Sequence, residues 1–205
     1  MINAVAVQDA GSMHTFPRHA TVRHLGLCGP PAEATKWLRN YAASGPEAVD
    51  RLLQIESVVL DIYIDIDEIQ LCGEVRLQDI AKLFDAVSDL CPNMHILVVH
   101  LSGDNAVDHA VLPYIGRRLP CLTELSMFNG LDDVLEIIDN HVDWSACIPP
   151  HLTKLSIPCS TLPHNLIQHL VQMPTMVEVE ASILHVNPGG GPAIKTESCA
   201  WKKLR

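Results

Sequence analysis

Two segments decide the fold: Pro120–Met127 (PCLTELSM) and Pro150–Ile157 (PHLTKLSI) place apolar residues at the same offsets after a proline. Further copies begin at Pro92 and Pro174, and all four read P-x-L-x-x-L-x-L when the apolar residues are treated as one class. The prolines lie 28, 30 and 24 residues apart along the chain. Self-similarity at a period of roughly 20 to 50 residues is typical of repeat proteins, so we expect one structural unit per copy.

Between these segments the apolar residues change to helical spacing. They recur at i, i+3, i+4 and i+7 over residues 77–91, 134–142 and 162–171, and more briefly over 48–53. A proline after the last helical turn ends the helix and favours extended backbone before it. The predicted unit is therefore a strand, a loop, a helix and a proline. Residues 107–115 also have helical spacing but contain Pro113, so this helix either kinks or begins near that proline.

Two weaker copies precede the four, at Val22–Leu27 and Ile55–Leu60, and neither has the proline. Residues 58–67 alternate between apolar and polar side chains, which is the strongest strand signal in the chain. We therefore expect about six strand and helix units within residues 21–186, preceded by a loose segment over 1–20 and followed by a flexible tail over 187–205.

The chain resembles the leucine-rich repeat family, and its helix-bearing units resemble the ribonuclease-inhibitor type. The resemblance rests on the apolar positions of two copies and the residues that follow them: Leu122, Leu125 and Met127, then Leu152, Leu155 and Ile157 with Ser160 and Leu162. It covers about 90 residues, or about 160 with the two weaker copies. The chain departs from the family where an asparagine is expected, because Ser102 and Gly130 occupy that position. The implied fold is an α/β solenoid with a curved parallel sheet and helices on its convex side.

The resemblance also implies that ligands bind to side chains on the concave face of the sheet. Alternation along the strands assigns to this face a mixed row, in which Ile96, Val98 and Phe128 would form an apolar patch. Such a patch marks a partner site unless an insertion or the amino-terminal segment covers it. The predicted partner-binding residues are Ile96, Val98, His100, Glu124, Ser126, Phe128, Lys154 and Ser156, with Asp61, Tyr63, Glu178 and Glu180 on the same face.

The composition of the chain limits which classes of partner we expect. The chain of 205 residues is 48% apolar, and 24 Asp and Glu against 14 Lys and Arg give a formal net charge of -10. Nucleic acid and membrane surfaces are therefore not expected partners, since both attract basic proteins. Residues 1–10 lack the basic and apolar regions of a signal peptide, which predicts a cytoplasmic protein.

No residue cluster predicts a reaction. The seven cysteines form no C-x-x-C pair, and the eleven histidines meet no known metal-ligand spacing, so we expect no metal, no cofactor and no catalytic residue. The first hypothesis is a noncatalytic scaffold that binds another protein on the concave face. The alternative is an enzyme with a doubly wound sheet and a site at the strand ends near His100 and Asp104.

Overall fold

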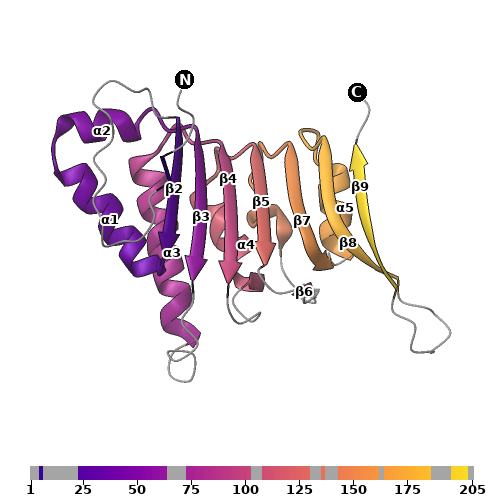
Figure 1. Ribbon diagram of the computed structural model, residues 1–205. Coiled ribbons are helices and arrows are strands. Elements are labelled where there is room, and N and C mark those ends of the chain that lie inside the picture. The colour runs from indigo at the N-terminus through magenta and orange to yellow at the C-terminus, as the bar shows by residue number, and fades with distance from the viewer. Residues whose placement is uncertain are drawn as a thin grey trace.

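The computed structural model describes residues 5–6, 23–63, 73–102, 108–129, 135–136, 143–161, 164–185 and 195–202 (Figure 1). These residues form one mixed α/β unit around a single sheet. The elements are β1 (Val5–Ala6), β2 (His24–Gly29), α1 (Pro31–Ala43), α2 (Pro46–Leu52), β3 (Ser57–Tyr63), α3 (Gly73–Leu90), β4 (Ile96–Ser102), α4 (Asp108–Arg118), β5 (Glu124–Asn129), β6 (Leu135–Glu136), the 3₁₀ helix η3 (Trp144–Ala146), β7 (Lys154–Thr161), α5 (His164–Gln172), β8 (Glu178–His185) and β9 (Lys195–Lys202).

The strands follow one another across the sheet in chain order. The sheet runs β1-β2-β3-β4-β5-β7-β8-β9, and the short β6 pairs with β7. All pairs from β1 to β8 are parallel, whereas β9 returns antiparallel to β8. A doubly wound sheet reverses its strand order at the crevice where ligands bind. Within the described residues the strand order does not reverse, so these strands do not form the crevice at which the doubly wound hypothesis places a site.

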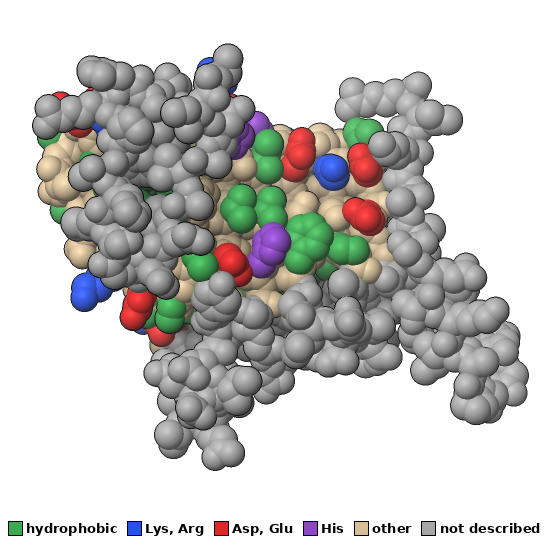
Figure 2. Space-filling model, in the orientation of Figure 1, with side chains coloured by type: hydrophobic (Ala, Val, Ile, Leu, Met, Phe, Trp, Pro, Cys, Tyr) green, Lys and Arg blue, Asp and Glu red, His purple; other side chains and the backbone are tan. Residues whose placement is uncertain are grey.

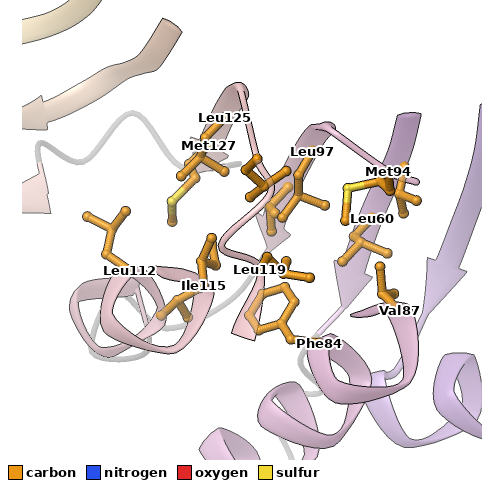
Figure 3. Packing of buried hydrophobic residues seen from close by; sticks show 14 of the residues in the cluster. Leu60, Phe84, Val87, Met94, Leu97, Leu112, Ile115, Leu119, Leu125 and Met127 are labelled. Atoms are coloured by element: carbon orange, nitrogen blue, oxygen red, sulfur yellow. The ribbon is translucent and has the colours of Figure 1, made fainter. Parts of the chain in front are cut away.

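The apolar positions of the sequence repeat form continuous rows in the core. Leu97 pairs in register with Leu125, and Leu125 with Leu155. All three side chains are 0% exposed, as the stacking of one leucine per unit predicts. Helix residues Phe84, from α3, and Ile115, from α4, pack against these rows (Figure 3).

The prolines lie where the repeat predicts them. Pro92, Pro120 and Pro174 each stand two residues after the end of a helix, namely α3, α4 and α5. All three are exposed, while Met94, Leu122 and Met176, two residues further on, are buried in the core. The proline therefore ends the helix and the next apolar residue anchors the following strand.

At the start of each strand, one backbone carbonyl accepts two hydrogen bonds from the beginning of the neighbouring strand. The carbonyl of Arg23 accepts from the backbone N–H groups of residues 56 and 57, at 2.8 and 3.1 Å. The same arrangement recurs in every following unit: Glu56 accepts from 95 and 96, His95 from 123 and 124, Thr123 from 153 and 154, and Thr153 from 177 and 178. The strands β2 and β3, whose sequence signal was weak, thus share this hydrogen-bond arrangement with the later strands.

Several elements differ from the sequence prediction. α4 begins at Asp108 and continues through Pro113, so a helix start at Pro113 is wrong. Residues 135–136 form β6 although a helix was expected over 134–142, and the rest of that segment lies outside the described residues. Residues 195–202, expected in a loose tail, form β9, and Val5–Ala6 form β1. α1 was not predicted, because its buried side chains are small or polar apart from Leu38.

Candidate functional site

The candidate site is the side of the sheet opposite to helices α3, α4 and α5, which we call the helix-free face (Figure 1). Strand alternation builds it, because residues between the buried positions of a strand point away from the core. All eight predicted partner-binding residues have this parity. His100 is exposed, and six are half-buried: Ile96, Val98, Glu124, Ser126, Phe128 and Lys154.

Apolar side chains gather near the middle of this face. We define the apolar patch as Val59, Ile96, Val98 and Phe128, which come from the adjacent strands β3, β4 and β5. Val59 and Val98 are register partners, and Val59 is 36% exposed. Figure 2 shows green side chains near the middle of this face, with red and blue side chains to the upper right and right of them. Ile96, Val98 and Phe128 therefore lie on one face of the sheet.

Val59 is the patch member that sequence reasoning missed. It has the same strand parity as Asp61, which was assigned to this face, so the signal was present in the alternation. The run of apolar residues at 58–60 concealed it, because Val58 and Leu60 on either side are 0% exposed. Parity therefore identifies this residue where hydrophobicity alone does not.

Polar side chains occupy the same register row as Phe128 on the neighbouring strands. The ring of His100 lies 5.0 Å from the ring of Phe128, centroid to centroid, with the planes tilted by 43°. Asp61 is the register partner of His100 on the other side, and the thiol of Cys28 lies 3.8 Å from the Oδ2 atom of Asp61. The row therefore passes from a thiol through a carboxylate and an imidazole to an aromatic ring.

On the β7 and β8 side the face carries hydroxyl and carboxylate side chains. Ser156 has the predicted parity but is only 4% exposed, and its hydroxyl donates a 2.7 Å hydrogen bond to Oε2 of Glu180 on β8. Ser156 thus has the predicted parity, but its side chain is too buried to serve as a contact residue. In the row of Ile96, Lys154 stands in register between Glu124 and Glu178.

The hydrogen-bonded pairing of β5 with β7 ends next to Phe128. They pair from Glu124 to Ser126 and from Lys154 to Ser156, and the register of β7 with β8 shifts beyond Ile157. Pro158 follows at this point, and a proline has no N–H to donate to a sheet ladder. Phe128 therefore lies beside the point where the ladder between β5 and β7 ends.

The chemical alternatives gain no support from the described residues. Among these residues there is no group of three His, Cys, Asp or Glu side chains that could hold a metal ion. Asp104 and the side chain of Tyr63 lie outside the described part. Burial raises the pKa of the Cys91 thiol to about 12, and burial also raises the pKa of Cys147, against the lowering effect of Arg117. Neither thiol has the lowered pKa that a nucleophilic cysteine requires.

Comparison with family models, with curated proteins and with solved structures finds no match to this chain. Within the described part, no helix combines the length and apolar character needed to cross a membrane. The interpretation of the site therefore depends on its own geometry.

Proposed function

We propose that this protein is a noncatalytic interaction scaffold of the leucine-rich-repeat-like type, whose helix-free face binds a segment of another protein in the cytoplasm. In this proposal the sheet is the curved inner surface of a solenoid and the helices cover its convex side. The consecutive parallel strand order and the repeated carbonyl bonds at the strand starts support the repeat architecture.

The observation that carries the proposal is the apolar patch on a face that the described helices leave uncovered. Apolar residues on the solvent side of a strand are disfavoured unless another surface buries them. Here Val59, Val98 and Phe128 keep partial exposure although the core side of the same strands is fully packed. A bound segment that places an apolar side chain against Phe128 would remove that surface from water.

The test compares two double variants in affinity capture from an extract of the source cells. Val98→Ser with Phe128→Ser removes apolar surface from the helix-free face. Val171→Ser with Leu53→Ser removes comparable surface elsewhere, from side chains that are 54% and 39% exposed. Captured proteins are quantified by mass spectrometry, and thermal unfolding of each variant is recorded by circular dichroism.

We expect wild type and the control variant to enrich the same partner, and the patch variant to lose it by more than about tenfold, as for truncation of interface anchors. Its melting temperature should fall by no more than a few degrees, since no fully buried side chain is changed. Equal capture by both variants, or no capture above the empty matrix, would contradict the proposal. Unfolding of the patch variant would show that these residues belong to the core.

A further inference from the structure

The last strand, β9, forms an edge of the sheet. It pairs with β8 over eight residues, from Glu178 opposite Lys202 to His185 opposite Lys195, and it stands at the end of the strand order (Figure 1). In an antiparallel pair, the backbone N–H and C=O groups of alternate residues point towards the neighbouring strand. The other residues of β9 therefore direct these groups away from β8, on a side where no described strand pairs with them.

β9 lacks most of the features that protect edge strands from pairing with another chain. Protected edges are usually short, or carry a proline, a bulge or a central charge of the lysine type. β9 has eight residues (KTESCAWK) without proline or glycine, and its register pairs with β8 are consecutive, whereas the register of β7 with β8 shifts. Its lysines stand at the two ends, at positions 195 and 202. The edge therefore offers main-chain donors and acceptors to another extended strand.

A second copy of β9 matches this edge better than the opposite edge of the sheet does. At the opposite edge β1 covers only two residues of the six-residue β2, so that edge is stepped. A head-to-tail contact would be interrupted at the step and would repeat into an open filament. Pairing of β9 with β9 instead closes as a two-fold dimer and removes both free edges at once, whereas a peptide strand would leave a new edge.

Two-fold symmetry also decides which positions of the two β9 strands lie opposite each other. One position lies opposite its own copy, so the numbers of any two opposite positions differ by an even number. Lys195 and Lys202 differ by an odd number and therefore cannot be opposite each other. With the axis at Ser198 or at Cys199, which gives the longest overlap, no lysine of β9 is opposite another lysine of β9. The repulsion expected of like charges on opposite positions is thus avoided.

We infer that two copies of the chain associate through β9, whose outer edges pair antiparallel into one continuous sheet. Because the two-fold axis is perpendicular to the sheet, both helix-free faces lie on the same side. The order β5-β7-β8-β9 places the two copies of Phe128 seven strand spacings apart, or roughly 34 Å. The inference does not depend on the proposed function, but it would give the scaffold two apolar patches on one surface, and hence bivalent binding.

The experiment measures amide hydrogen exchange of the full wild-type chain at concentrations from about 1 to about 500 μM, with sedimentation velocity of the same samples. Exchange is read at single residues by mass spectrometry with electron-transfer fragmentation. In the monomer, β8 should protect alternate amides of β9, and the amides between them should exchange fast. As the dimer forms, this second set should slow by at least about tenfold, while the first set should change little.

A matched pair of variants tests the same contact. Whichever of Ser198 and Cys199 has the fast-exchanging amide is replaced by proline, because an edge strand tolerates proline where its N–H faces solvent. Ser198→Pro or Cys199→Pro should then remain monomeric at every concentration, while alanine at the same position, which keeps the N–H group, should dimerise like wild type.

A wild-type chain that sediments as a monomer throughout would overturn the inference. So would a dimer in which the exchange of β9 is unchanged, or species that keep growing with concentration, as a head-to-tail contact predicts. The wild-type exchange data test the inference even if the proline variant does not fold. None of these outcomes depends on whether the helix-free face captures a partner, so the proposed function is tested separately.

Discussion

Substitution of Gly116 by alanine tests the contact between α4 and the segment that follows η3. An ideal Cβ atom at this position would lie 1.8 Å from the carbonyl oxygen of Cys147 and 2.2 Å from its carbonyl carbon. It would also lie 2.9 Å from the backbone nitrogen of Ile148. Carbon and oxygen atoms normally approach to about 3.3 Å, so the two backbones would have to separate by roughly 1.5 Å.

Two effects with opposite signs act at this position. Alanine is a better helix former than glycine by about 1 kcal/mol in a helix interior, which would stabilise the protein. Overpacking typically costs about 1–3 kcal/mol and more where backbone must move. Cys147 and Ile148 resist such movement, because both of their N–H groups donate to the carbonyl of Trp144, at 3.1 and 3.0 Å. The steric term should therefore exceed the helix term.

We expect Gly116→Ala to lower the free energy of unfolding by about 2 kcal/mol, since the contact atoms belong to backbone and not to a flexible side chain. For a chain of this size that corresponds to a fall in melting temperature of about 4–8 °C. Urea and thermal unfolding followed by far-ultraviolet circular dichroism measure both quantities. The matched control is Arg117→Ala, an exposed neighbour on the same helix, which should change stability by less than about 0.5 kcal/mol. If Gly116→Ala unfolds at or above the wild-type temperature, α4 does not approach Cys147 as closely as the structure shows.

Two further predictions concern the core and its thiols. Leu125→Ala and Leu155→Ala should each lower the free energy of unfolding by about 2–5 kcal/mol, because both side chains are fully buried in the register row, whereas Ser126→Ala should change it little in urea unfolding. Iodoacetamide should label the exposed Cys121 in the native protein and should leave Cys91 unlabelled until denaturant is added, because Cys91 is 1% exposed and burial raises its pKa to about 12. Equal native labelling of the two, determined by peptide mass spectrometry, would contradict the packing around Cys91.

The buried side of the fold could be predicted from sequence because buried positions require apolar residues, and these recur at regular intervals along the chain. The stacking of Leu97, Leu125 and Leu155 follows directly from the P-x-L-x-x-L-x-L pattern, since the three apolar positions after each proline are buried in the core. Among the side chains that the structure describes, those of the opposite parity lie on the helix-free face. Parity could not show that Ser156 is buried, because that depends on Glu180 from a strand 24 residues away along the chain.

Other features depend on pairing that local sequence does not contain. β9 forms by antiparallel pairing with β8, and its composition of mixed polar and apolar residues gives no clear alternation. The helix over 108–118 passes through Pro113 because tertiary packing of Val111, Leu112 and Ile115 outweighs the local cost of the proline. In both cases the deciding energy comes from residues distant in the chain.

The ladder at the strand starts explains how the repeat can persist where its sequence signal fades. Each unit contributes one carbonyl that accepts from two consecutive N–H groups of the next, and this bonding needs no particular side chain. In the described part of this ladder, the hydroxyls of Thr123 and Thr153 also donate, to the carbonyls of His95 and Thr123, at 3.2 and 2.9 Å. The carbonyls of Arg23 and Glu56 make the same backbone bonds in the units without the proline. Register along the sheet is therefore set jointly by main-chain pairing and by the buried apolar rows, and neither requires a particular side chain on the helix-free face.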